Sequence, residues 1–413
     1  MIEVETKPRP ATANANVLVG RQPICRANNQ TLGYELLFRN SQVNEAVIQN
    51  PEQATAQVIV NTFMEIGLER MVGASLAFIN VTRDFILGDH CRSLPKDRVV
   101  LEILENTVPD AELFRALGEL HDVGYRFALD DFTFKAETKP LLPYCDYIKV
   151  DLRQVEREQI SAELPALRRQ KLKLLAEKVE TIDEYEYCKK TGFEYFQGYF
   201  FCRPHIVQGS KVPVNRLSLC RLLAKLQDPE IDMRELESIV GQDLSLSYKI
   251  LRYINSAYVT LLKSVESIGH AVRLVGTEHI RLLASLIMLT SMDDKPKELI
   301  YTSLIRAKMC EMLGVREGYK NREAFFTVGL FSALDAFLDC SMKDALELLP
   351  LSQEIRDALL LHRGPLGEVL QYVLTYEQAL DTLDLTRIQG DTLRNTYLDS
   401  IAWGNDLVSK LAS

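Results

Sequence analysis

The 413-residue sequence has eight cysteines but no two that are closely spaced. A CxxC metal or redox motif is therefore excluded. Scattered cysteines in a long chain are typical of reduced core residues, so we predict a cytoplasmic protein without a zinc site.

No apolar run reaches the length that crosses a bilayer, and we predict no membrane insertion. Residues 1–15 lack the apolar centre of a signal peptide, and we expect a flexible tail there.

Positive charge is not in excess either. The 48 Lys and Arg residues are outnumbered by 57 Asp and Glu residues, which gives a net charge of −9. This balance disfavours direct nucleic-acid binding through bulk electrostatics. It still permits a phosphate ligand, because a bound divalent cation can reverse the sign of the local charge.

The chain is long enough for two or three domains, and its two halves differ in pattern. Residues 16–205 alternate short runs rich in Val, Ile, Phe and Tyr with amphipathic segments such as Glu52–Ile66 and Ala111–Asp122. The first two strands are separated only by Arg26–Thr31, too short for a helical crossover, so they should be antiparallel. We predict an α/β modified TIM-like barrel with one antiparallel strand. The predicted strands are Val17–Cys25, Leu32–Phe38, Leu76–Val81, Val99–Leu104, Arg126–Asp130, Tyr147–Val150, Lys173–Glu177 and Glu194–Tyr199.

Strand patterns almost vanish in the second half. We predict a linker at residues 206–215, which contain Pro, Gly, Ser and Lys, and an all-α domain at 216–405. Helical patterns are clear near Ile300–Leu313, Glu323–Phe337, Ser352–Leu361 and Leu366–Leu380. The histidines of this half are isolated, so we expect no metal site there.

Polar residues recur at the ends of the apolar strands of the first half. Burial of an isolated carboxylate is costly, and barrels assemble active sites from strand ends, so the pattern indicates a site. Carboxylate and amide oxygens suit Mg²⁺ or Mn²⁺. The lysine could balance charge, position a water or accept a proton. These residues are Glu35, Asn80, Glu102, Asp130, Asp131, Lys149, Asp151 and Glu177.

Each of these residues alone has a simpler interpretation. A single acid is more often a salt-bridge partner or a helix cap, and Asp130-Asp131 could merely begin a loop. Glu177 and Glu180 could be an exposed pair. The common position of the acids at strand ends favours a shared site.

Several motifs occur in a fixed order along the first half. They are Glu35-Leu36-Leu37 with Arg39, then Asn80, Glu102 with Glu105, Asp130-Asp131-Phe132, Lys149-Val150-Asp151, Ala176-Glu177-Lys178-Val179-Glu180 and Gln197-Gly198-Tyr199. In this order they resemble the EAL domain of cyclic di-GMP phosphodiesterases.

The resemblance implies a role for each matched residue. Six residues would ligate one or two Mg²⁺ or Mn²⁺ ions: Glu35, Asn80, Glu102, Asp130, Asp131 and Glu177. Lys149 would hold or activate the attacking water, and Asp151, Glu180 and Gln197 complete the catalytic group. Gln22 and Arg39 would lie near the substrate, and Glu105 would support a loop.

The second half resembles an HDOD domain, through Gln242–Ala257 and Ser267–Gly276. Catalytic relatives carry a His-Asp pair after Gly-Leu-Leu, whereas here Gly329-Leu330-Phe331 is followed by Ser332-Ala333. The resemblance implies a regulatory or partner-binding module.

Three functions therefore stay open. The first is hydrolysis of cyclic di-GMP to pGpG, regulated by the HDOD domain, with a possible homodimer. The second is a non-hydrolytic cyclic di-GMP sensor. The replacement of the family's glycine-rich loop at Thr133–Ala136 favours it, whereas the complete ligand set favours the first. Lys178 is a further departure, since the family has glycine there. The third is an interaction scaffold, which the retained acids disfavour.

Overall fold

The structure is a computed structural model that describes residues 17–28, 30–40, 67–198, 222–223, 225–226, 231–241, 244–257, 265–290, 292, 295–377, 388 and 390–412. The predicted tail 1–15, the helix Glu52–Ile66 and the linker 206–215 lie outside these residues.

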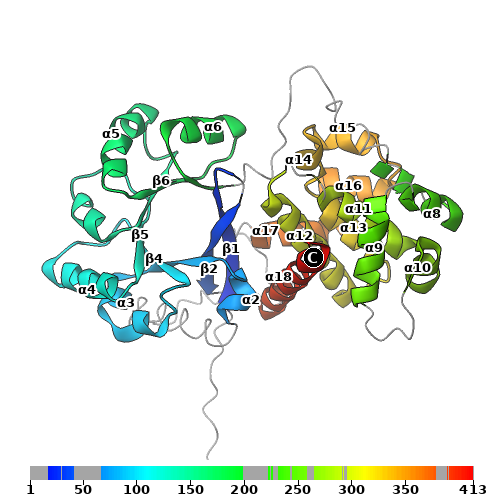
Figure 1. Cartoon of the computed structure of the whole chain (residues 1–413), viewed down its shortest axis with the longest axis horizontal. Coiled ribbons are helices and arrows are strands. Elements are labelled where there is room, and N and C mark those ends of the chain that lie inside the picture. Colours follow the sequence, from blue (N-terminus) through cyan, green and yellow to red (C-terminus); the bar gives the residue numbers. More distant parts are fainter. Residues whose placement is uncertain are drawn as a thin grey trace, which may run out of the picture.

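Eight strands form a closed barrel in the order β1 to β8 (Figure 1). Strand β1 pairs antiparallel with both of its neighbours, β2 and β8, and every other pair is parallel. The predicted fold class is confirmed, including the single antiparallel strand. The strands are β1 Val17–Arg26, β2 Thr31–Asn40, β3 Leu76–Val81, β4 Val99–Ile103, β5 Arg126–Leu129, β6 Tyr147–Asp151, β7 Lys173–Glu177 and β8 Tyr195–Gln197.

Short helices connect the parallel strands. Asp110 caps α4 by accepting from the Leu113 amide, and Thr181 and Glu184 form the expected capping box of α6. Gly192 ends α6 in a left-handed conformation, also as expected. The described connecting helices are α2 Leu68–Val72, α3 Arg83–Leu87, η1 Asp89–Ser93, α4 Ala111–Asp122, η2 Lys139–Tyr144, α5 Arg157–Arg169 and α6 Ile182–Thr191.

In the described residues from 222 onward every element is a helix, as predicted. The pattern at Glu323–Phe337 predicted one segment, but the helix breaks at Ser332 and Ala333, where Arg306 Nη1 donates to the Ser332 hydroxyl. The helices are α8 Met233–Gly241, α9 Leu244–Ala257, α10 Ile268–Val275, α11 Thr277–Thr290, α12 Lys297–Arg316, α13 Arg322–Phe331, α14 Leu334–Leu338, α15 Met342–Glu347, α16 Gln353–Leu361, α17 Gly364–Glu377 and α18 Gly390–Ala412.

The interior of the barrel consists of an apolar layer and a polar layer. Side chains two positions apart on a strand share a face, so most residues of the lower, apolar layer have a polar residue of the same strand above them. Phe78 precedes Asn80 in this way, and Val100 precedes Glu102. The apolar layer contains Ile24, Leu32, Phe78, Val100, Ala128, Tyr147, Leu175 and Tyr195. It fills the lower part of the barrel, below the polar layer.

Gly198 follows β8 where the backbone of the neighbouring loop approaches most closely. Its φ is +147°, and a Cβ there would lie 2.1 Å from the Val179 carbonyl oxygen. We expect Gly198→Ala to lower the free energy of unfolding by about 2 kcal/mol, because of both overpacking and backbone strain. Urea denaturation measures this change. Gly241→Ala is the control, since a Cβ at that position would meet no described atom within 4 Å; an equal loss in both variants would contradict the prediction.

Candidate active site

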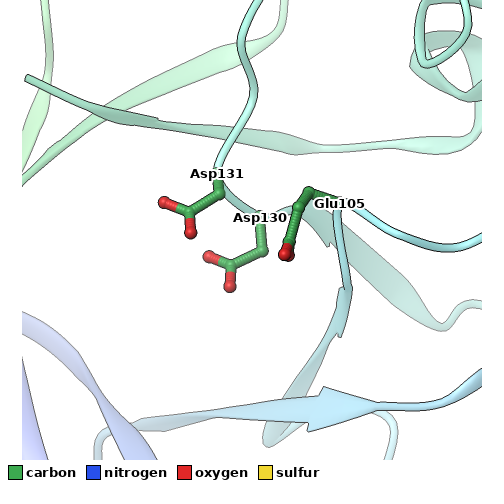
Figure 2. Close-up of side chains that lie close together, drawn as sticks. All are labelled: Glu105, Asp130 and Asp131. Carbon is green, nitrogen blue, oxygen red and sulfur yellow. The ribbon is translucent and has the colours of Figure 1, made fainter. Parts of the chain in front are cut away.

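The carboxyl ends of β4 and β5 bring three carboxylates together. One oxygen each from Glu105, Asp130 and Asp131 lies within 4.8 Å of the others (Figure 2). Asp131 adopts a left-handed φ of 44°, which turns the chain directly after Asp130. This spacing is one that a single cation could bridge.

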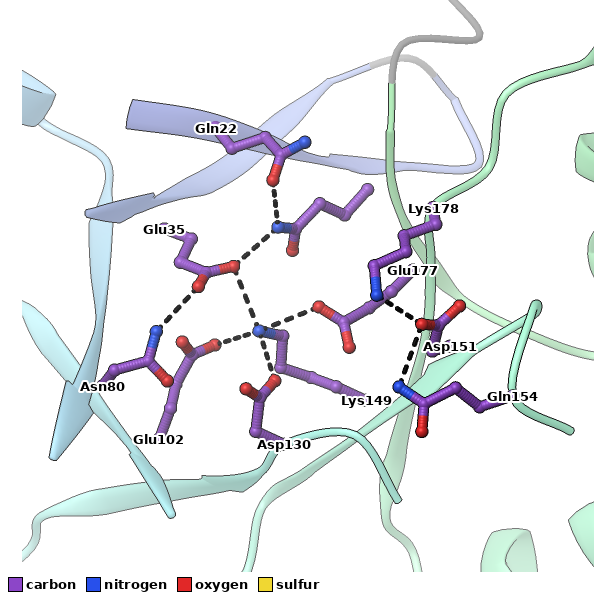
Figure 3. A network of polar contacts seen from close by, with 11 residues as sticks. Gln22, Glu35, Asn80, Glu102, Asp130, Lys149, Asp151, Gln154, Glu177 and Lys178 are labelled. Carbon is purple, nitrogen blue, oxygen red and sulfur yellow. Dashed lines mark hydrogen bonds and ion pairs between the residues drawn. The ribbon is translucent and has the colours of Figure 1, made fainter. Parts of the chain in front are cut away.

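Lys149 lies at the centre of the polar layer, and its side chain is 1% exposed. Its Nζ is 2.7 Å from both Glu102 Oε1 and Asp130 Oδ1, 3.0 Å from Glu177 Oε1 and 3.1 Å from Glu35 Oε2 (Figure 3). Four strands therefore contribute carboxylates to one point. The sequence pattern predicted that these side-chain oxygens share one site at the strand ends, and they do meet at one rim of the barrel.

Amide side chains hold Glu35 in place. Asn80 Nδ2 donates to Glu35 Oε1 at 2.8 Å, and Gln197 Nε2 donates to Glu35 Oε2 at 2.6 Å. Gln197 Nε2 also lies 2.8 Å from Gln22 Oε1, which joins β1, β2 and β8. The side chain of Arg39, the other expected substrate contact, lies outside the described part of the structure.

Burial and mutual repulsion control the ionisation of this cluster. Burial would lower the pKa of Lys149, but Glu102, Glu177, Glu35 and Asp130 together raise it well above its usual value, so the side chain is an ammonium. The sequence left three roles open for Lys149: balancing charge, positioning a water and accepting a proton. Its positive charge disfavours the last of these. Burial raises the pKa of Glu102, Asp130 and Glu177, the last to about 8.

Glu35 is the exception among these acids. Burial would raise its pKa, but Lys149 and the hydrogen bonds from Gln197 and Asn80 lower it below its usual value. Glu35 is therefore the carboxylate that stays ionised most readily.

Several buried oxygens of the cluster lack a hydrogen-bond donor among the described residues. Asn80 Oδ1 and Glu102 Oε2 are the clearest cases. Glu102 Oε1 and Asp130 Oδ1 are also unsatisfied by hydrogen-bond geometry, although both lie 2.7 Å from the ammonium of Lys149. Buried oxygens without donors are costly unless a cation takes that place, so the donor set fits a divalent metal.

Asp151 and Glu180, both expected in the catalytic group, lie beside the cluster rather than in contact with Lys149. Asp151 pairs with Lys178 and accepts from Gln154 Nε2 at 3.1 Å, and Glu180 pairs with Arg153. Lys178 has a left-handed φ of 54°, as would suit glycine. The sequence marked Lys178 as a departure from the family, but it did not predict this ion pair.

The loop Thr133–Ala136 also differs from a glycine-rich loop in structure. Phe134 adopts a φ of 60°, and its ring packs edge-on against Phe132 with the centroids 4.9 Å apart. Both rings are buried. Aromatic packing thus fixes a segment for which the family uses glycine.

The raised pKa values predict that metal binding depends on pH. A protonated carboxylate does not bind metal, so binding must release protons from groups such as Glu177, whose pKa is about 8. We expect Mn²⁺ affinity to rise by up to about tenfold per pH unit, for each proton released, between about pH 6 and 8. Calorimetry in buffers of different ionisation enthalpy measures both quantities. A pH-independent affinity without proton release would contradict the prediction.

A closed α/β barrel with a buried carboxylate and amide set at its strand ends, followed by a helical domain, defines a two-domain protein with a hard-metal site. The chain belongs to the family in which an EAL domain precedes an HDOD domain. The EAL domain model matches residues 9–204, and the HDOD domain model matches residues 213–358.

Two relatives align with most of the chain. "Cyclic di-GMP phosphodiesterase CdgJ" of Vibrio cholerae is 35% identical over 366 residues, which cover 87% of this chain and 85% of that protein. "Uncharacterized protein YuxH" of Bacillus subtilis is 31% identical over 404 residues, covering 95% and 99%.

Two solved structures each align with less than half of this chain. The Klebsiella pneumoniae BlrP1 manganese/cy-diGMP complex is 20% identical with a TM-score of 0.39, covering 47% of this chain and 57% of that one. An EAL domain protein from Listeria monocytogenes is 21% identical with a TM-score of 0.37, covering 45% and 87%. Among the described helices, none combines the length and apolar character of a membrane span.

Proposed function

We propose that this protein hydrolyses cyclic di-GMP to linear pGpG in the EAL barrel and that the HDOD domain is a regulatory or partner-binding module. The observation that carries the proposal is the convergence of Glu35, Glu102, Asp130 and Glu177 on one buried point, with oxygens that lack donors. The name of the Vibrio cholerae relative supports the substrate.

The polar layer would hold one or two Mg²⁺ or Mn²⁺ ions through Glu35, Asn80, Glu102, Asp130, Asp131 and Glu177. Bound there, the metal lowers the pKa of a coordinated water and neutralises charge on the phosphate. We assign residues 16–205 to the barrel, 206–215 to a linker and 216–405 to the helical domain, and we expect a cytoplasmic protein.

The side chains of the chain itself have distinct tasks. As an ammonium, Lys149 donates hydrogen bonds and orients the attacking water, while Gln197 keeps Glu35 in position. The water oxygen bonds to phosphorus as one P–O3′ bond breaks, and the leaving O3′ takes up a proton. The proton that the water loses balances the proton that the leaving O3′ takes up. Gln22 and Arg39 would contact the substrate, Glu105 would support the adjoining loop, and Asp151 and Glu180 would steady the strand ends.

A non-hydrolytic sensor is the second candidate, and the loop Thr133–Ala136 favours it. Phe134 of that loop packs against Phe132 of the preceding motif, whereas the family carries a glycine-rich loop there. A sensor of this kind would bind cyclic di-GMP with negligible turnover and pass the bound state to a partner through the HDOD domain.

One experiment separates these functions. Full-length protein is incubated with cyclic di-GMP and Mn²⁺, the products are analysed by chromatography, and binding is measured by calorimetry. We expect pGpG from the wild type and none from Glu35→Ala. Binding without product supports the sensor, whereas neither binding nor product contradicts both proposals.

A further inference from the structure

The hairpin formed by β1 and β2 lies between the polar layer of the barrel, which is the candidate metal site, and the helical domain. In Figure 1 it lies on the side of the barrel that faces the helical domain, next to α17 and α18. Both helices contact β1, and α18 also contacts α2. The Tyr376 hydroxyl on α17 donates to the Val19 carbonyl at 2.9 Å, and this bond is buried.

The two faces of this hairpin have different partners. Gln22 and Glu35, a directly opposed pair, point into the barrel and share the hydrogen-bond donor Gln197. Their sequence neighbours Arg21 and Tyr34 point outward, because side chains alternate along a strand. The Arg21 guanidinium lies 4.1 Å from the centroid of the Tyr34 ring.

Glu298 of the helical domain reaches this outer face. It stands in the first turn of α12 and is 2% exposed. Tyr34 Oη and Thr31 Oγ1 each donate to Glu298 Oε2 at 3.1 Å. Among the described residues these are its only hydrogen-bond donors, and both belong to β2. A buried carboxylate is costly, yet here the helical domain directs one at the β1–β2 hairpin, where the Arg21 charge and the two donors of β2 stabilise it.

The backbone links this contact to the site directly. Tyr34 and Glu35 are consecutive residues, so any displacement of β2 at Tyr34 moves the Glu35 carboxylate as well. Glu35 accepts from Asn80 and Gln197 and contacts Lys149, and these interactions tolerate only small shifts. The outer contact therefore acts on the carboxylate that Asn80, Gln197 and Lys149 all contact.

We propose that Glu298 is a positioning residue: through Tyr34 and Thr31 the helical domain fixes β2 and thereby holds Glu35 in place for metal binding. A partner that moves α12 would then weaken the metal site from outside the barrel. The inference concerns the metal site itself and rests on the proposed function only for the consequence to turnover.

The test compares variants on both sides of the contact. We expect Glu298→Ala and Tyr34→Phe each to weaken Mn²⁺ binding by about tenfold, as is usual for groups that orient a ligand, and to speed hydrogen exchange of β2 amides. The double variant should be no weaker than the more affected single variant, because both changes remove one contact. Glu298→Gln keeps an acceptor oxygen and should restore most of the affinity.

Asp399→Asn is the matched control. Asp399 pairs with Arg70 across the same two domains at 3.0 Å, but both side chains are 52% exposed and neither lies on β2. Unchanged Mn²⁺ affinity in a folded Glu298→Ala protein would overturn the inference, as would an equal loss in Asp399→Asn. If Glu298→Ala does not fold, Tyr34→Phe decides in the same way. Mn²⁺ affinity is measured without cyclic di-GMP, so an absence of hydrolysis would count against the proposed function and not against this inference.

Discussion

We expect Lys149→Met, studied with EDTA present, to lose about 4 kcal/mol of unfolding free energy. The Nζ of Lys149 lies within 3.1 Å of four carboxylates and is the only cation that the structure shows, among its described residues, in contact with all of them. Without it, burial and mutual repulsion would act on the carboxylates uncompensated. The pKa of each carboxylate would rise, so the loss should be smaller at acidic pH, where they are protonated.

Urea denaturation with EDTA and with Mn²⁺ measures this effect. Mn²⁺ should restore part of the lost stability, because a bound cation replaces the missing charge. Turnover should still fall by about a hundredfold, since the ammonium that orients the water is removed. Lys178→Met is the control: its side chain is 48% exposed, and its buried partner Asp151 keeps hydrogen bonds from the Arg153 amide and Gln154 Nε2, so we expect a smaller loss, of about 1 kcal/mol. Equal losses would mean that Lys149 is not the electrostatic centre.

The barrel could be predicted because its signals are local. Apolar runs of strand length, separated by helices, define the strands, and the short Arg26–Thr31 connection defines the antiparallel pair. The polar layer was also visible, since residues such as Glu102 stand alone in an apolar strand. Period-two alternation then places them on one face, above Val100 and its equivalents.

The remaining features depend on contacts between distant parts of the chain. In the sequence, Glu298 looks like any acid in the first turn of a helix, and nothing local shows that Tyr34 lies against it. The ion pair of Lys178 with Asp151 depends on a left-handed backbone that lysine rarely adopts. The break between α13 and α14 has no glycine or proline to mark it, because the tertiary contact of Ser332 with Arg306 lies there.

Removal of a negative charge from the same cluster, in place of the positive charge of Lys149, should change turnover and stability in opposite directions. We expect Glu102→Gln to reduce turnover by about a thousandfold, because it removes a charged ligand from the centre of the site. The same substitution should raise the stability of the metal-free protein by about 1–2 kcal/mol. Glu102 is 0% exposed, and burial together with Glu35 raises its pKa well above the usual value, so its ionised form destabilises the fold.

The stability gained by Glu102→Gln should increase with pH. An acid whose pKa is higher in the folded than in the unfolded state costs stability as pH rises from the unfolded pKa towards the folded one. The stabilisation by Glu102→Gln should therefore be small near about pH 5 and larger near about pH 8. Denaturation at both pH values with EDTA measures it, and Glu105→Gln, an exposed acid of the neighbouring cluster, is the control. A destabilised Glu102→Gln protein would contradict the prediction, because it would show that the buried carboxylate stabilises the fold without a metal.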